Sequence, residues 1–140
     1  MATIVKRVSI DLAPQRVWDA VRDWGAVHQR LCPGVLTDTT VEGEARIVTF
    51  AGGLVAKELI VAVDDDARRL VWAVVGTQLL SHHNGAMQVL AEGQGSRIVW
   101  TADLLPHDAA ERVAGFMDLG CAAMKTTLEG VYARRSTNEM

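Results

Sequence analysis

The sequence is poor in cysteine and carries no charge excess that would direct it to a polyanion. Its 140 residues contain two cysteines, Cys32 and Cys121, which lie far apart in the chain. This usage is typical of reduced thiols in a cytosolic protein and disfavours a structural disulfide. The formal net charge is −3, and Lys and Arg are scattered, so nothing indicates nucleic acid or an anionic membrane as a partner.

Long apolar runs are also missing. No stretch approaches the roughly 18 residues that a membrane span requires. The first residues, with Lys6 and Arg7 in an alternating pattern, contain no apolar run long enough for a signal peptide. Hydrophobic residues make up 49% and charged residues 22%, which is a globular balance. We therefore expect one soluble, cytoplasmic domain over residues 1–140, large enough to fold without a disulfide or a metal.

Runs of β-branched residues broken by turn residues occupy much of the chain. Alternating apolar residues predict a first strand at about residues 3–11. Six further strands are expected near residues 35–42, 44–51, 54–64, 69–77, 82–91 and 96–105. The connections between these six are short, which indicates sequential antiparallel hairpins, since parallel pairs need long crossovers.

Helical periodicity appears in two regions. Pro14 suits a first helical turn, and the spacing of apolar residues after it predicts a helix to about Trp24, followed by a short one over 26–31. A long amphipathic helix is expected over about 108–132, with a frayed polar tail over 134–140. An antiparallel sheet needs a cover for its apolar face, and this helix is the one large candidate. The fold class predicted is α+β.

Several short motifs follow one another in a characteristic order. They are Ile10-Asp11-Leu12-Ala13-Pro14 with Val17-Trp18, Asp23-Trp24-Gly25, Pro33-Gly34-Val35, Glu58 through Val63-Asp64-Asp65, Trp100 with Asp103-Leu104-Leu105-Pro106, and Met124-Lys125 with Leu128-Glu129. Over essentially the whole chain, this order resembles the START-like, Bet v 1-like superfamily, in its polyketide cyclase/dehydrase (SRPBCC) branch.

The resemblance implies the helix-grip fold. In that fold a curved, seven-stranded antiparallel sheet wraps around a long C-terminal helix, with two short helices after strand 1 and a cavity between sheet and helix. It does not imply one reaction, because the superfamily holds cyclases, other lyases, carriers and receptors.

Side-chain parity, propagated across the predicted hairpins, assigns an inward face to the sheet. The expected cross-strand pairs are Arg46–Glu58, Ala62–Trp72, Ile60–Val74, Met87–Trp100 and Val89–Ile98. With the last helix, this face predicts a cavity for an apolar ligand. The side chains expected to bind that ligand are Trp72, His83, Met87, Trp100, Phe116, Met117, Gly120 and Met124. Gly120 either leaves room for the ligand or lets the helix pack closely, and the sequence supports both equally.

Arg46 and Glu58 are the candidate catalytic residues. A guanidinium beside a carboxylate in a low-dielectric cavity can polarise a carbonyl and move a proton, as cyclisation, dehydration or enolisation requires. Some enzymes of the fold that the resemblance implies use a cavity arginine and glutamate. The alternative is an ion pair on the solvent face, contributing less than about 1 kcal/mol. Both faces of the strand at 54–64 are apolar, so parity alone does not separate the two.

His82 and His83 are adjacent but do not make a metal site. Neighbouring residues of a strand point to opposite faces, so these two cannot chelate one ion through their spacing. We expect no metal and no cofactor. His83 alone is either a general base or a hydrogen-bonding group at the rim of the cavity.

Two functional classes follow from these features. One is a cofactor-independent enzyme with lyase- or cyclase-type acid–base chemistry on a hydrophobic, polyketide-like carbonyl compound. The other is a carrier or sensor of an apolar ligand, and a structural dimer with a vestigial cavity is a weaker third. In each of the first two, the expected partner is a small hydrophobic molecule, with no nucleic acid, no membrane, and a homodimer as an open option.

Overall fold

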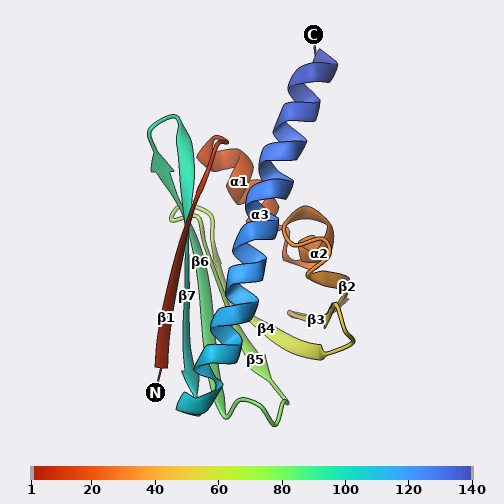
Figure 1. Cartoon of the computed structure of the whole chain (residues 1–140), viewed down its shortest axis with the longest axis vertical. Helices are drawn as coiled ribbons and strands as arrows, with labels where there is room; N and C mark the ends of the chain where they lie inside the picture. Colours follow the sequence, from red (N-terminus) through yellow and green to blue (C-terminus); the bar gives the residue numbers. More distant parts are fainter. Residues whose placement is uncertain (1, 140) are drawn as a thin grey trace.

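Seven strands form one antiparallel sheet in the computed structural model, which describes the backbone of residues 2–139 and the side chains of residues 2–130 (Figure 1). In chain order the strands are β1 (Ala2–Ile10), β2 (Leu36–Glu42), β3 (Ala45–Phe50), β4 (Val55–Asp64), β5 (Arg69–Val75), β6 (His82–Glu92) and β7 (Gly95–Leu105). Their order across the sheet is β1-β7-β6-β5-β4-β3-β2. The first two strands are therefore the two edges, and every expected strand is present.

Three α-helices complete the fold over residues 2–139. They are α1 (Pro14–Arg22), α2 (Val27–Arg30) and α3 (Ala110–Glu139), with the 3-10 turns η1 (Trp24–Ala26) and η2 (His107–Ala109). The first helix ends two residues before the expected Trp24, which belongs to η1. The tail that we expected to fray continues α3 to Glu139, because neither Gly nor Pro follows Gly130 to stop the helix.

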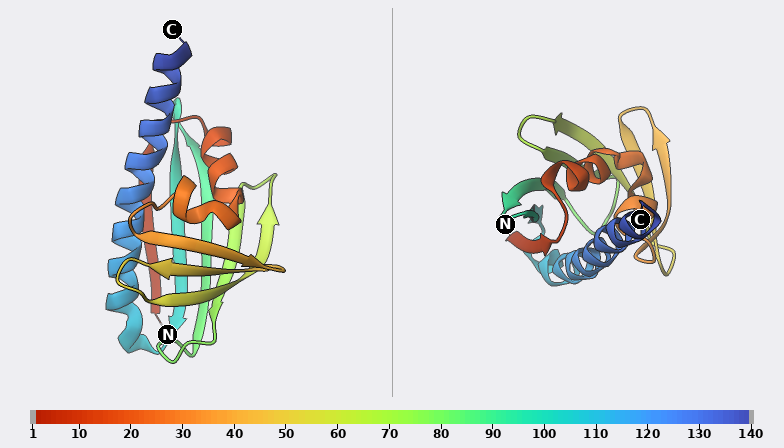
Figure 2. Two further views of the ribbon diagram at one scale, coloured as in Figure 1. Left: turned by 90° about the vertical axis from the view of Figure 1, so that its right-hand side faces the viewer. Right: turned by 90° about the horizontal axis from the view of Figure 1, so that it is seen from above.

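The sheet curves around α3. Seen from above, β1 and β2 bracket the helix from two sides, while α1 and α2 close one end of the concave face (Figure 2). This arrangement confirms the α+β helix-grip fold that the sequence predicts. None of the helices in the described part of the chain has the length and apolar character that crossing a membrane requires.

The cross-strand registers decide which side chains share the concave face. The expected pairs Arg46–Glu58, Met87–Trp100 and Val89–Ile98 are confirmed. The expected pairs between β4 and β5 are wrong: Ala62 pairs with Val71, one residue from the expected Trp72, and Ile60 pairs with Trp72, two residues from the expected Val74. Glu58 pairs with Val74. The turn itself displaces the register by one residue, and a β-bulge between Ile60 and Ala62 adds a second, since it leaves one residue of β4 unpaired. On the Glu58 side of the bulge, Glu58, Ile60, Trp72 and Val74 still share one face of the sheet, as predicted.

Two hydrophobic clusters fill the concave face. The larger one joins α1 to the sheet through residues such as Val17 and Trp18, and the smaller one centres on Leu104 and Met117. Trp100 packs against both clusters. Residues of both clusters also line a cavity between the sheet and α3, where the candidate site lies.

Candidate functional site

A cavity of about 460 Å³ lies between the concave face of the sheet and α3. Seven of the eight expected ligand-binding residues line it: Trp72, His83, Met87, Trp100, Phe116, Met117 and Gly120. The eighth, Met124, is fully buried in the larger core cluster together with Val17 and Trp18, and it is not part of the cavity wall. At the level of Met124 the side chains of the core have already filled the space between helix and sheet.

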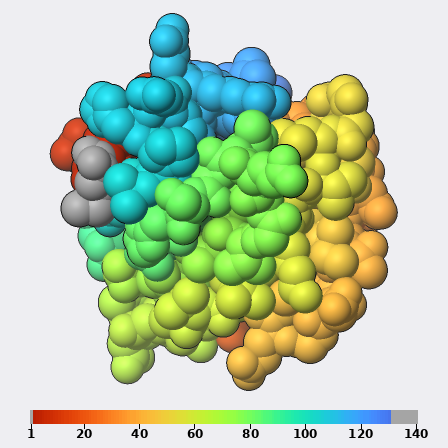
Figure 3. Space-filling view, turned by 90° about the horizontal axis from the view of Figure 1, so that it is seen from below, coloured from red at the N-terminus to blue at the C-terminus, as the bar shows by residue number. Residues whose placement is uncertain are grey.

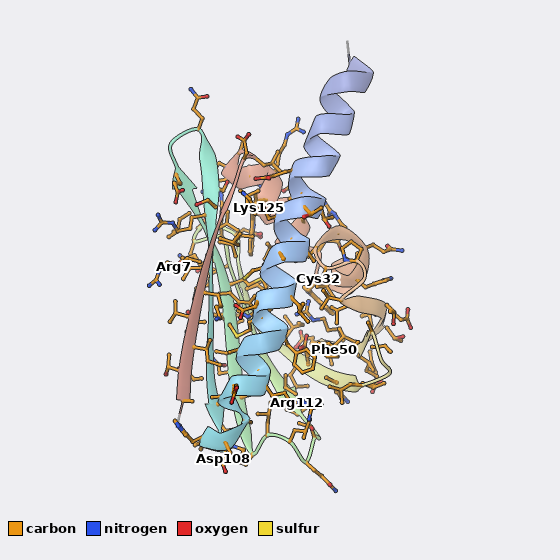
Figure 4. All side chains as sticks on the ribbon, in the orientation of Figure 1. Arg7, Cys32, Phe50, Asp108, Arg112 and Lys125 are labelled. Atoms are coloured by element: carbon orange, nitrogen blue, oxygen red, sulfur yellow. The ribbon has the colours of Figure 1, made fainter. Side chains whose placement is uncertain are left out.

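Other wall residues did not emerge from the sequence. Phe50 lines the cavity and packs against Phe116, with ring centroids 4.9 Å apart (Figure 4). Its parity with Arg46 on β3 is a signal that could have identified it. Leu79 and Leu80 line the cavity from the β5–β6 connection, which has no periodicity from which their direction could be predicted.

Gly120 makes room for the ring of Trp100 rather than for a ligand. A Cβ atom added at Gly120 would lie 2.8 Å from Cζ3 of Trp100, which is closer than real side chains allow. Of the two interpretations of this glycine, the structure therefore supports close packing.

Arg46 is buried, with 4% of its surface exposed, and it is held on three sides. Its Nε donates a hydrogen bond to Oε1 of Glu58 over 2.7 Å, and its Nη1 donates to the backbone carbonyl of Trp24 over 3.1 Å. The guanidinium carbon lies 5.4 Å from the ring centroid of Trp72, in a cation–π geometry. The guanidinium is therefore fixed before any ligand arrives.

The Arg46–Glu58 pair belongs to the cavity and not to the solvent face. The side chains are 5% and 12% exposed, and both residues line the cavity. Among the described residues, none forms a hydrogen bond with Nη2 of Arg46 or Oε2 of Glu58, and neither atom is fully buried. One donor and one acceptor of this cavity-lining pair thus have no hydrogen-bond partner among the described residues.

His83 lies in the wall and not at the rim. It is 9% exposed, and its Nδ1 accepts a hydrogen bond from the backbone N–H of Val74 over 3.2 Å. Burial lowers the pKa of His83, and the nearby Glu58 carboxylate opposes this shift only in part. A ring whose Nδ1 is an acceptor carries its proton on Nε2, so His83 is unsuited to the general-base role considered from the sequence.

His82 and Cys32 do not add a catalytic group to the site. His82 is exposed on the opposite face of β6. Cys32 lines the cavity, but burial raises the pKa of its thiol to about 12, which disfavours the thiolate form that a nucleophile needs. Among the residues whose side chains are described, no three His, Cys, Asp or Glu side chains gather where they could hold a metal ion.

Three segments surround the mouth of the cavity. They are the β3–β4 turn and the first residue of β4, with Leu54 and Val55, the β5–β6 connection with Leu79, and η2 with the start of α3, which carry Asp108 and Arg112. Figure 3 shows these segments meeting on one face, and Figure 4 shows Asp108 and Arg112 at the corresponding end of α3. The rim carries charge on the helix side and apolar residues on the sheet side.

Comparison with known proteins places this architecture in one family. The family model described as polyketide cyclase/dehydrase and lipid transport matches residues 1–131. No curated protein sequence gives a significant match.

Solved structures share the fold over nearly their whole length. A solution structure from Thermobifida fusca is 26% identical, with a TM-score of 0.77, and the alignment covers 96% of this chain and 95% of the other. The protein XoxI from Bacillus cereus is 17% identical, with a TM-score of 0.82 and coverage of 91% and 96%. Ara h 8.0201 is also 17% identical, with a TM-score of 0.72 and coverage of 91% and 97%.

Proposed function

Because the chain belongs to the polyketide cyclase/dehydrase and lipid transport family, we propose that it binds a small hydrophobic molecule in the cavity between the sheet and α3. We further propose that Arg46 and Glu58 perform acid–base chemistry on that molecule without a metal or a nucleotide cofactor. One observation carries the proposal: an ion pair inside a mostly apolar cavity keeps an unused N–H and an unused carboxylate oxygen.

The chemistry follows from what these two atoms can do. Oε2 of Glu58 takes a proton from a carbon next to a ligand carbonyl, and the electron pair of that C–H bond moves onto the carbonyl oxygen. Nη2 of Arg46 donates a hydrogen bond to the resulting enolate oxygen. The protonated Glu58 then returns its proton either to a β-hydroxyl that leaves as water or to the oxygen of a second carbonyl that the enolate carbon attacks. The first course is a dehydration and the second a cyclisation.

A carrier or sensor is the second candidate function. Most residues of the wall are apolar, and a fixed arginine can anchor a ligand oxygen without any proton transfer. Turnover distinguishes the two functions, because a carrier releases the molecule unchanged.

Native mass spectrometry of the purified protein tests binding first, since a co-purified molecule identifies the compound to assay. Glu58→Gln then tests catalysis. We expect turnover to fall by roughly 10²–10⁴-fold with little change in ligand affinity, as when proton transfer is lost. Glu42→Gln is the matched control, because Glu42 forms an exposed ion pair with Lys57. Full turnover in Glu58→Gln would remove the catalytic assignment and leave the carrier function.

A further inference from the structure

The ladder between β5 and β6 opens beside the cavity. Regular pairing runs from Arg69–Gln88 to Trp72–Gly85 and stops there. Two residues later on β5, the backbone N–H of Val74 has no strand partner on β6. It donates instead to Nδ1 of His83, the residue that a continued ladder would place opposite it. A side chain thus replaces a backbone carbonyl in the sheet.

This hydrogen bond fixes the protonation of the ring. A backbone N–H can only donate, so Nδ1 of His83 is unprotonated and Nε2 carries the hydrogen. No residue with a described side chain accepts from Nε2, and this nitrogen is not fully buried. Since His83 lines the cavity, its free N–H is offered to whatever occupies it.

His83 stands at the end of a row that crosses four strands. Arg46 on β3 pairs with Glu58 on β4, and Glu58 pairs with Val74 on β5. The backbone N–H of Val74 in turn donates a hydrogen bond to His83 on β6. Arg46 and His83 are therefore three strands apart, or roughly 14 Å between backbones. The Arg46 side chain shortens this separation, because its guanidinium extends to Glu58 on β4 and to the ring of Trp72 on β5. A single ligand with two well-separated oxygen atoms can therefore contact both residues, one oxygen at Arg46 and the other at His83.

We propose that His83 is a specificity-determining residue whose neutral ring donates its Nε2 hydrogen to an oxygen acceptor of the ligand. The inference rests on the binding function proposed above and narrows its ligand class to hydrophobic molecules with two separated oxygen acceptors, such as diketones. One oxygen accepts a hydrogen bond from Arg46, and the other accepts one from His83. A hydrocarbon of the same shape leaves the N–H of His83 desolvated and unpaired, which disfavours its binding.

A pair of shape-matched probes tests this selectivity. 2,6-Diacetylnaphthalene carries two separated carbonyl groups, and 2,6-diisopropenylnaphthalene, which has a CH2 group in place of each carbonyl oxygen, is the hydrocarbon counterpart. Affinities are measured by isothermal titration or by dye displacement. The carbonyl stretches of the ¹³C-labelled diketone are followed by difference infrared spectroscopy, which reports hydrogen bonding to each oxygen directly.

Replacements at His83 separate its two hydrogen bonds. His83→2-pyridylalanine keeps an acceptor for the N–H of Val74 and removes the donor to the cavity, whereas His83→Gln retains an N–H donor. His82→Gln, on the exposed face of β6, is the matched control. Thermal unfolding by circular dichroism verifies that each variant folds.

We expect the pyridylalanine variant to bind the diketone about fivefold to tenfold more weakly, with one carbonyl band moving to higher frequency. Its affinity for the hydrocarbon should not fall, and His83→Gln should recover most of the diketone affinity. Unchanged diketone affinity and an unchanged infrared spectrum in the pyridylalanine variant would overturn the assignment of His83 alone. A wild-type protein that binds neither probe would overturn the binding function together with it.

Discussion

The indole ring of Trp72 occupies the space that a side chain at Gly85 would need. A Cβ atom at Gly85 would lie 2.8 Å from Cε2 of that ring. The two residues are paired across β5 and β6, at the last regular pair before the ladder opens. The same ring lies against the guanidinium of Arg46. A glycine on β6 thereby determines where an arginine of β3 is held.

Gly85→Ala should therefore affect the site as well as the fold. The added methyl group forces the Trp72 ring to move, and overpacking of this kind costs about 1–3 kcal/mol of unfolding free energy. Urea unfolding measures the loss, and the near-ultraviolet circular dichroism of the tryptophans reports the ring movement. Gly115→Ala is the control, because apart from its chain neighbours and the nearby backbone of its own helix nothing lies within 4 Å of a Cβ at that exposed position. We expect that variant to be more stable than wild type by about 0.5–1 kcal/mol. Equal stability of Gly85→Ala and wild type would contradict the argument.

The Trp100 ring gives a second steric test. Gly120→Leu should push this ring away from α3 toward the cavity and weaken the binding of apolar dyes. The steric cost is again about 1–3 kcal/mol, so circular dichroism must show that the variant folds. Ala122→Leu, at an exposed position of the same helix, controls for the added leucine. A folded Gly120→Leu protein with wild-type dye affinity would count against the proposed wall.

A structural feature could be predicted from the sequence where nearby residues alone determine it. The Arg46–Glu58 pair could be predicted because the tight turn at Gly52-Gly53 fixes the register of the hairpin. The pairs between β4 and β5 could not, because the bulge near Val61 leaves no mark in the alternation of apolar residues. Neither could the exclusion of Met124 from the cavity wall, because it depends on how far the core extends between α3 and the sheet.

The role of His83 could not be predicted from the sequence, for the same reason. Parity correctly places it on the concave face. Its hydrogen bond to Val74 exists because β5 and β6 separate after Trp72 and Gly85, and this separation depends on tertiary structure. From the sequence alone, a buried histidine is equally compatible with a general base and a hydrogen-bond donor. The hydrogen bond from the backbone of Val74 favours the donor.

The buried ion pair makes a thermodynamic prediction. Arg46→Met leaves the carboxylate of Glu58 in an apolar wall without its partner, which should cost up to about 3–5 kcal/mol of unfolding free energy. Replacing both groups, as Arg46→Met with Glu58→Leu, removes the unpaired charge and should recover much of that loss. Urea unfolding of the two single variants and the double variant gives the coupling. Additive effects of the two substitutions would mean that the residues do not stabilise each other.

Protonation of His83 should govern part of the acid sensitivity of the fold. Burial lowers the pKa of this ring below its ordinary value of 6.5, despite the attraction of Glu58 and Asp103, and His82 adds to the lowering. Below about pH 6.5 the unfolded chain therefore binds a proton that the folded chain does not. Stability contributed by the neutral ring is fully present above pH 6.5 and is lost as the pH falls toward the folded pKa, by at most about 1.4 kcal/mol per pH unit. The carboxyls of Asp65, Glu92 and Glu129, whose pKa values are lowered from values already below 5, lose their contributions at lower pH.

His83→Gln should remove this component, because glutamine does not titrate. Urea unfolding at half-unit steps from pH 7.5 to 5 gives the free energy of unfolding of wild type and variant. The difference between the two curves should be flat above pH 6.5, and below it wild type should lose stability faster than the variant. His82→Gln, which removes a histidine from the exposed face of β6, serves as the control for the substitution itself. Parallel curves for wild type and His83→Gln over the whole range would mean that the ring takes up a proton equally well in the folded chain. Such a ring would not be the fixed neutral donor that the Val74 contact indicates.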